Sequence, residues 1–168
     1  MPSSSPNIER YTPRWIFEGL GVYFDLDPCA PVGDCPSKAF CNAWYSLPQD
    51  GLQLPWEGSV WLNPPWTRGA KTHWLARLAA HSRGGIALVR GGADSRWLHE
   101  ASPSSLFMFR GRVGYVRGDG QDERDRKGKA TGGFEPSMLL GYGPLATEVL
   151  SEAKLNGLFC SSVEKHAT

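Results

Sequence analysis

The sequence predicts an α/β sandwich built around a mainly parallel β-sheet that finishes with an antiparallel pair. Short apolar runs typical of buried strands alternate with segments of helical spacing. Polar turns also follow three of the predicted strands, at Asp27-Pro28, Asn63–Trp66 and Arg90–Asp94. Because the carboxyl ends of parallel strands share one rim of a sheet, where α/β proteins bind ligands, we expect these turns to form one site.

The first helix is expected over residues 14–20. Thr12 has a side chain suited to an N-cap, and Pro13 suits the first helical position. Gly21 is a stop signal. The predicted apolar face of this helix consists of Trp15, Ile16 and Leu20.

The remaining elements follow from hydrophobic periodicity and from glycine and proline positions. Residues 29–54 are dense in Pro, Gly, Asp and Asn and are expected to be mostly loop. A short helix should begin after Asp94 as its N-cap, and another should cover 144–156 and stop at Gly157. A helix over 71–81 should bury Trp74, Leu75, Leu78 and Ala79. Strands are expected over 22–26, 59–62, 86–89, 106–109, 113–116 and 137–142.

The 168 residues are expected to form one domain, 1–168, large enough to bury a core without disulfides or metals. A net charge of +1 gives no global electrostatic attraction for nucleic acid, so any such contact needs a local basic face. Residues 118–133 combine charges of both signs with five glycines and predict a mobile loop. This loop is either a flap that contacts nucleic acid or a surface insertion. The best candidates for a basic face are Arg110, Arg112 and Arg117.

The amino terminus has no apolar signal segment, and no apolar run approaches the roughly 20 residues of a membrane span. We therefore expect a cytoplasmic protein without a membrane partner, and the oligomeric state stays open. Three cysteines are evenly spaced, but they include no Cys-x-x-Cys pair, so we favour buried or incidental thiols over a metal site. These cysteines are Cys29, Cys35 and Cys41.

The most informative stretch is the apolar run 60–62, which breaks directly into Asn63-Pro64-Pro65-Trp66. Two prolines cannot continue a strand, so the chain halts in a rigid turn. The Asn63 side-chain oxygen and the Pro64 carbonyl could each accept one hydrogen of an aromatic amine, while Trp66 stacks on its ring. Two such acceptors draw the nitrogen toward tetrahedral geometry and free its lone pair for attack. The alternative is an ordinary strand-ending turn whose tryptophans pack on the core.

This turn resembles the (Asn/Asp/Ser)-Pro-Pro-(Tyr/Phe/Trp) signature of amino-group methyltransferases that act on DNA bases. Residues 12–142 as a whole resemble the phage-type DNA N6-adenine methyltransferases, a compact Dam-like family that uses S-adenosylmethionine. The order and spacing of short landmarks carry the resemblance. These landmarks are Thr12–Trp15, Phe24–Ala30, Asp50–Leu52, Trp56–Trp66, Asp94–His99, Phe109–Arg112 and Pro136-Ser137.

The resemblance implies a Rossmann-like class I methyltransferase sandwich in a bacterial cell or a phage-infected host cell. It implies DNA, expected to be double-stranded, as the partner, and N6 of adenine as the target. The catalytic turn would be Asn63, Pro64, Pro65 and Trp66. The implied S-adenosylmethionine site consists of Thr12, Pro13, Asp27, Pro28, Cys29, Ala30 and Asp50. The expected DNA-contacting residues are Arg90, Arg110, Arg112 and Arg117.

Three features depart from the family's pattern. Trp66 stands where Tyr or Phe is more usual, and the segment 118–133 is longer. The family commonly has Leu-Pro-Ala-Arg-Thr-Asp where this chain has 89–94, so Gly92 takes the arginine's place and Arg90 is a candidate substitute. Cytosine-N4 methylation, methylation of a protein glutamine or an RNA base, and an inactive DNA-binding or regulatory homologue all remain open.

Overall fold

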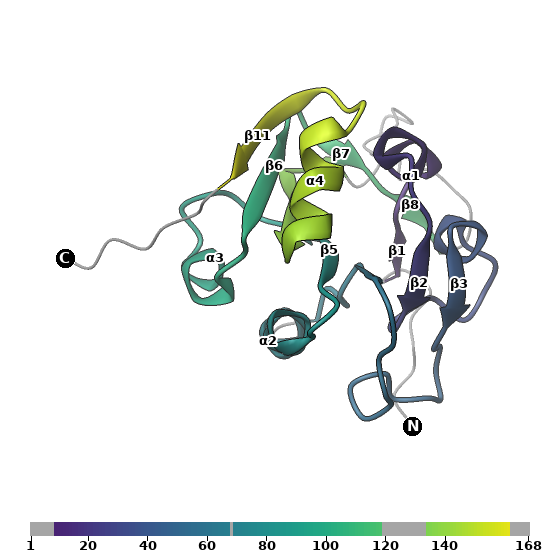
Figure 1. The fold of residues 1–168 in the computed structure, drawn as a ribbon. Helices are drawn as coiled ribbons and strands as arrows, with labels where there is room; N and C mark the ends of the chain where they lie inside the picture. The colour runs from purple at the N-terminus through teal and green to yellow at the C-terminus, as the bar shows by residue number, and fades with distance from the viewer. Residues whose placement is uncertain (1–8, 68, 119–133, 162–168) are drawn as a thin grey trace, which may run out of the picture.

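The computed structural model describes residues 9–67, 69–118 and 134–161 (Figure 1). Seven strands of this part form one mixed sheet in the order β11-β6-β10-β5-β4-β2-β3. Its strands are β2 (Phe24–Asp27), β3 (Cys41–Trp44), β4 (Val60–Leu62), β5 (Gly85–Arg90), β6 (Ser105–Phe109), β10 (Ser137–Tyr142) and β11 (Gly157–Ser161). The helices are α1 (Arg14–Leu20), α2 (Ala70–Ala80), α3 (Arg96–Ala101) and α4 (Pro144–Glu152), with a 3-10 turn η1 (Pro36–Ala39). Two small antiparallel pairs join β1 (Arg10–Tyr11) to β8 (Val116–Arg117) and β7 (Val113–Gly114) to β9 (Phe134–Glu135).

The sheet has a parallel half and an antiparallel half. β3, β2, β4 and β5 are parallel neighbours, whereas β10 is antiparallel to both β5 and β6, and β11 is antiparallel to β6. The antiparallel part is therefore three strands wide, rather than the terminal pair that the sequence predicted. The additional strand is β11, which the sequence did not predict. The last helix ends at Glu152, not at Asn156, and Gly157 opens a strand, where a Cβ would lie 2.2 Å from the Met108 carbonyl oxygen.

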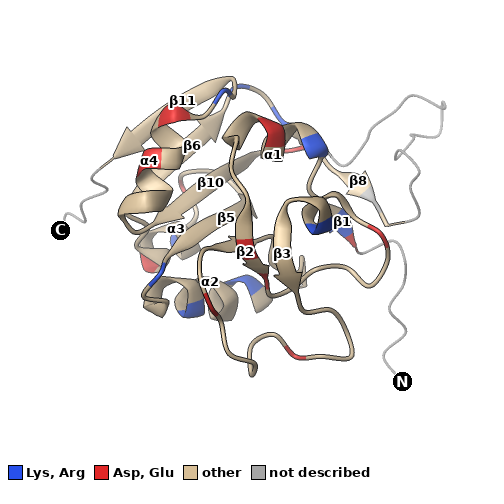
Figure 2. Ribbon diagram, turned by 45° about the vertical axis from the view of Figure 1, so that its right-hand side comes forward, with Lys and Arg blue, Asp and Glu red and all other residues tan. Residues whose placement is uncertain are grey.

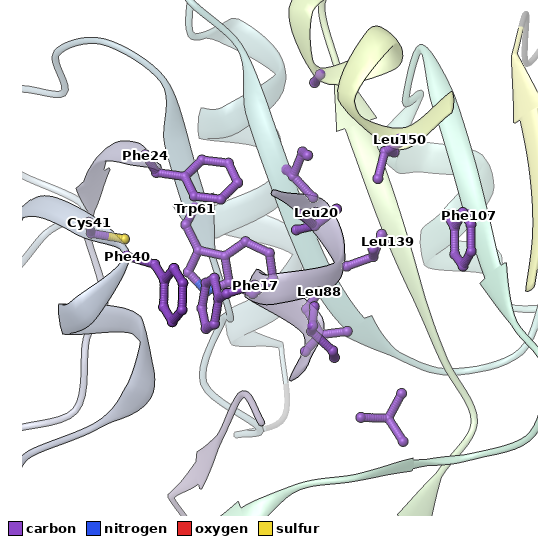
Figure 3. Packing of buried hydrophobic residues seen from close by; sticks show 14 of the residues in the cluster. Phe17, Leu20, Phe24, Phe40, Cys41, Trp61, Leu88, Phe107, Leu139 and Leu150 are labelled. Carbon is purple, nitrogen blue, oxygen red and sulfur yellow. The ribbon is translucent and has the colours of Figure 1, made fainter. Parts of the chain in front are cut away.

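Helices α1 and α4 cover one face of the sheet, and α2 and α3 cover the other (Figure 1). Alternate side chains of β5 point to opposite faces, as the two-residue period of a strand requires. Ile86 and Leu88 join the cluster under α1 and α4, and Ala87 and Val89 join the cluster under α2 and α3. Figure 3 shows the aromatic centre of the first cluster, where Phe17 lies 4.9 Å from Phe40 and 4.6 Å from Trp61, centroid to centroid.

The bounds predicted for α1 and β10 are confirmed, but several predicted details are wrong. Residues 29–54 contain η1 and β3, because Phe40 and Cys41 pack into the core despite the polar sequence around them. The run 113–116 divides at Tyr115, which is buried edge-on against Trp66 with its ring 4.8 Å away. Trp15 is 45% exposed, whereas Phe17 takes the predicted buried position.

Two predicted helix caps also differ from the structure. Pro13, not Thr12, is the N-cap of α1, and the Thr12 hydroxyl instead accepts a hydrogen bond from Asn63. Ser95, not Asp94, is the N-cap of α3, and no side chain caps that helix. On α2, Ala79 is exposed and does not join the predicted apolar face. Gly21 does end α1 in the left-handed conformation, with φ of 67°.

The strand order places a reversal point between β2 and β4. The chain leaves β2 toward β3 on one side and leaves β4 toward β5 on the other side. These two connections diverge, so a crevice opens beyond the carboxyl ends of β2 and β4. In doubly wound α/β sheets this is the position where ligands bind. Asp27 ends β2 and Asn63 follows β4, so both lie at this crevice.

Candidate active site

A cavity of about 410 Å³ opens at this crevice. The structure brings most of the predicted site residues together around it, from four separate parts of the chain. They are Thr12, Asp27, Pro28, Cys29, Ala30, Asp50, Asn63, Pro64, Pro65 and Trp66. Pro13 was predicted to bind in the same place, but it caps α1 and does not line the cavity.

Asn63 is held in one orientation by residues from the start of the chain. Its Nδ2 lies 2.9 Å from the carbonyl oxygen of Arg10 and 3.3 Å from Oγ1 of Thr12. Because a carbonyl oxygen can only accept, the amide nitrogen must face Arg10 and the Oδ1 atom must face the other way. Among the described residues, no donor is bonded to Asn63 Oδ1. The side chain therefore offers one acceptor to a ligand.

The loops after β2 and β4 are joined through Cys29. Its Sγ donates to the carbonyl oxygen of Asn63 at 3.2 Å, and its backbone N–H donates to Asp27 Oδ1 at 3.1 Å. Burial raises the pKa of the Cys29 thiol well above its ordinary value, so the thiol remains a hydrogen-bond donor. Cys29 thus links the two loops through these two hydrogen bonds.

Asp27 is a buried carboxyl group on the wall of the cavity. It is only 2% exposed, and burial raises its pKa from 3.8 to about 6, although hydrogen bonds from Ser37 and the Cys29 amide and the charge of Lys38 act in the opposite direction. A carboxyl group that is costly to ionise because it is buried favours a ligand that carries a positive charge, since such a ligand offsets the desolvation.

The Trp66 indole lies between several side chains of the site. The Arg90 guanidinium lies over its ring, 4.3 Å from the centroid, and that of Arg10 lies at 5.6 Å. Tyr115 contacts the ring edge-on and donates or accepts a hydrogen bond with Ser137 at 2.9 Å. Arg90 therefore reaches the Asn63–Trp66 turn from the end of β5, two positions before Gly92.

The wall opposite this turn comes from the segment that follows β3. Gly51 packs so closely on the loop after β2 that a Cβ on Gly51 would lie 1.8 Å from the carbonyl oxygen of Pro28. The Gly51 carbonyl in turn accepts a 2.8 Å hydrogen bond from Trp56 Nε1. Asp50 accepts from the Leu52 amide at 3.0 Å and lines the cavity. Tyr45, Leu47 and Gln49 also line the cavity but were not predicted to do so. They follow the carboxyl end of β3, and this strand was not expected from the sequence.

Three of the predicted DNA-contacting arginines, Arg90, Arg110 and Arg112, do not line this cavity. Arg110 and Arg112 are exposed after β6, which runs in the same direction as β5 and so ends at the same rim. Arg117 belongs to β8, which pairs with β1. Figure 2 shows Lys and Arg positions interspersed with Asp and Glu positions along the described ribbon. The charged segment 118–133 lies outside the described residues, apart from Gly118.

In the part of the chain that the structure describes, every helix is too short or too polar to cross a membrane. No group of three His, Cys, Asp or Glu side chains in that part of the chain could hold a metal ion. Cys35 and Cys41 are buried, as free thiols.

A family model described as DNA N-6-adenine-methyltransferase (Dam) matches residues 8–158, which is most of the chain. The match covers the turn after β4, the loop after β2 and the whole described sheet except the end of β11. No curated protein and no solved structure matches the chain.

Proposed function

Because the chain belongs to the DNA N-6-adenine-methyltransferase (Dam) family, we propose that it transfers a methyl group from S-adenosylmethionine to the N6 amine of adenine in double-stranded DNA. The observation that carries this proposal is the orientation of Asn63. Its amide nitrogen is occupied by Arg10 and Thr12, which leaves Oδ1 as an acceptor beside Trp66 and the cavity. We further propose that residues 1–168 form a single methyltransferase domain of the Rossmann-like class.

The cavity has the chemistry that S-adenosylmethionine needs. This cofactor joins a flat purine, a ribose and a methionyl portion that carries positive charge. Asp27 supplies a buried carboxyl group for the charged portion, and Asp50 supplies a carboxylate for polar groups of the adenosine portion. The remaining wall is mainly apolar and aromatic, which suits the purine. It includes Pro28, Ala30, Val32, Leu47 and Trp74.

In the proposed mechanism, Asn63 Oδ1 and the Pro64 carbonyl accept the two hydrogens of the target amine. These bonds oppose delocalisation of the nitrogen lone pair into the ring and direct it toward the cavity. When bound there, S-adenosylmethionine supplies an electrophilic methyl group on a positively charged sulfur. Neither acceptor is a base, so the proton released by the methylated amine passes to water. Catalysis then comes from positioning and from acceptors that are already oriented.

The target adenine must leave the duplex to reach this turn, which costs a few kcal/mol. Stacking on Trp66 and the two hydrogen bonds at the amine offset that cost. The turn holds the Trp66 indole at the cavity, with Tyr115 against the edge of its ring. Arg90 lies over the same ring, so the base must share the indole with the guanidinium or displace it.

The test is transfer of labelled methyl from S-adenosylmethionine to unmethylated duplex DNA, followed by mass spectrometry of the nucleosides. We expect N6-methyladenine from the wild type and none from Asn63→Ala, while that variant keeps its melting temperature and its cofactor affinity. Asn156→Ala is the matched control, because Asn156 is exposed between α4 and β11. Near wild-type turnover of Asn63→Ala would refute the assignment of the turn.

The same experiment separates the alternatives. N4-methylcytosine would identify the same chemistry on the other exocyclic amine. Cofactor binding without label in any DNA would redirect the search to RNA or protein substrates. A chain that does not bind S-adenosylmethionine by calorimetry would be an inactive DNA-binding or regulatory homologue.

A further inference from the structure

A second cavity, of about 270 Å³, adjoins the Asn-Pro-Pro-Trp turn on the side of β5. It shares the segment Pro64–Thr67 with the first cavity, so the turn forms a wall of both. Its other walls come from the first turn of α2, the end of β5 and Trp97 of α3. The mechanism proposed above uses only the side of the turn that faces the larger cavity.

Two cationic side chains are fixed in this second cavity. Lys71 Nζ donates to the Arg90 carbonyl oxygen at 2.8 Å and lies 3.8 Å from the centroid of the Trp97 ring. The Arg90 guanidinium lies over the Trp66 ring. Each cation is therefore held against an indole before any ligand arrives, so binding requires little further ordering of these long side chains.

No carboxylate balances the two charges within the lining. Among the described residues that line this cavity, none is Asp or Glu. The contact of Arg90 with Glu135 is long, at 3.7 Å, and both side chains are more than a third exposed, so it neutralises little charge. Burial and the neighbouring Arg90 lower the pKa of Lys71 to about 8, so a nearby negative charge would favour the protonated form of this lysine.

We propose that Lys71 and Arg90 together bind a phosphate of the DNA strand next to the extruded adenine. This inference rests on the proposed function for the identity of the strand. The cavity adjoins Trp66, on which the base would stack, and a phosphodiester is the anion that a nucleotide carries close to its base. Lys71 would bind as a point charge and Arg90 through its planar group of donors. Such a contact positions the strand and carries no sequence information of its own.

The test measures the affinity of an unmethylated duplex oligonucleotide as a function of salt concentration. Lys71→Met keeps the apolar stem against Trp97 and removes the charge. We expect it to weaken binding to every sequence and to reduce the slope of log K against log salt by about 0.9. Lys71→Arg should restore most of the slope. Arg83→Met is the matched control, since Arg83 is exposed just before β5, at the opposite end of that strand from Arg90.

Three outcomes would overturn the inference. The first is an unchanged slope for a folded Lys71→Met variant, and the second is an equal loss for Arg83→Met, which would indicate a general effect of charge. The third concerns the source of the phosphate. If inorganic phosphate at constant ionic strength raises the melting temperature as much as the duplex does, and does so only with Lys71 present, the ligand is free phosphate.

The two proposals can fail separately, because the salt slope is read without methyl transfer. A wild-type protein that forms no methylated base but shows the Lys71-dependent slope would refute the catalytic proposal and support the phosphate site. A wild-type protein that methylates adenine, with a Lys71→Met variant of unchanged slope and unchanged KM for DNA, would refute the phosphate site alone.

Discussion

The side-chain N–H of Asn63 donates a hydrogen bond to the carbonyl oxygen of Arg10, with Nδ2 2.9 Å from that oxygen and the two residues 53 positions apart in the sequence. Arg10 belongs to β1, which pairs with β8 outside the main sheet. The proposed catalytic amide is therefore oriented by a strand that the signature around Asn63 does not include. Thr12, next to that strand, provides the second acceptor.

The first prediction concerns Asn63→Asp, a change that the general signature tolerates. In this chain a carboxylate cannot donate to Arg10, and it would place an oxygen against the Arg10 carbonyl. We expect kcat to fall by about tenfold or more, equivalent to roughly 1.4 kcal/mol in the barrier. Single-turnover methyl transfer measures this directly. If the variant retains wild-type kcat, the bond to Arg10 does not orient the amide.

The second prediction uses the buried carboxyl of Asp27, whose folded pKa is raised to about 6. A raised carboxyl pKa contributes stability that is fully present below the unfolded pKa, near 3.8, and is lost as pH rises through 6. Asp27→Asn removes this loss, so the cofactor-free variant should melt at a higher temperature than the wild type above pH 6, and near the wild-type temperature at pH 4. Differential scanning calorimetry across this range measures the effect.

Asp25→Asn is the control of opposite sign on the same strand. Hydrogen bonds from Ser59, at 2.7 Å from its N–H and 3.0 Å from its Oγ, lower the pKa of Asp25. Its carboxylate therefore stabilises the fold above its unfolded pKa. Asp25→Asn should lower the melting temperature at neutral pH. Equal shifts for both variants would contradict the assignment of these two environments.

The third prediction is that cofactor affinity depends on ionisation of Asp27. A positively charged ligand binds the carboxylate and not the neutral acid, so affinity should fall as pH drops below about 6. Asp27→Asn should bind S-adenosylmethionine at least about tenfold more weakly at pH 8, or roughly 1.4 kcal/mol, and its affinity should lose this pH dependence. Titration calorimetry at several pH values would show whether it does. Affinity unchanged at pH 8 would exclude Asp27 from the charged portion of the site.

The fourth prediction concerns Gly51, where a Cβ would overlap the Pro28 carbonyl oxygen at 1.8 Å. Gly51→Ala must push apart the two loops that form the cavity. We expect a loss of about 1–3 kcal/mol in the free energy of unfolding, as for other overpacked sites, and weaker cofactor binding. Gly33→Ala is the control, because a Cβ there comes no closer than 3.4 Å to Tyr11. Equal effects of the two changes would contradict the proposed close contact.

The fifth prediction follows from Lys71, whose pKa is lowered to about 8. A lysine binds phosphate only while protonated, so DNA affinity should fall as pH rises through and beyond 8. Lys71→Arg keeps its charge in this range and should flatten the dependence. Fluorescence anisotropy with one duplex at constant ionic strength, from pH 7 to pH 10, measures it. Parallel curves for the two proteins would mean that another group titrates.

The sequence by itself was sufficient to place the Asn63–Trp66 turn and to predict much of the fold. Two consecutive prolines must end a strand, so Asn63 and Trp66 could be placed just beyond β4 without coordinates. The bounds of α1 and β10 were also predictable, because glycine stops and apolar runs act locally. The convergence of Asp27 and Asn63 followed from the shared rim of parallel strands.

Only the tertiary structure decided how these residues are held and which neighbours they have. β3 and β11 form because a sheet edge offers hydrogen bonds to segments whose own sequences resemble loop or helix end. The bond from Asn63 to Arg10 and the stack of Arg90 on Trp66 join parts of the chain that no local pattern relates. The pKa shifts of Asp27 and Lys71 arise from burial. Burial is a property of the packed molecule, so the sequence determined which groups could react and the fold determined their orientation and charge.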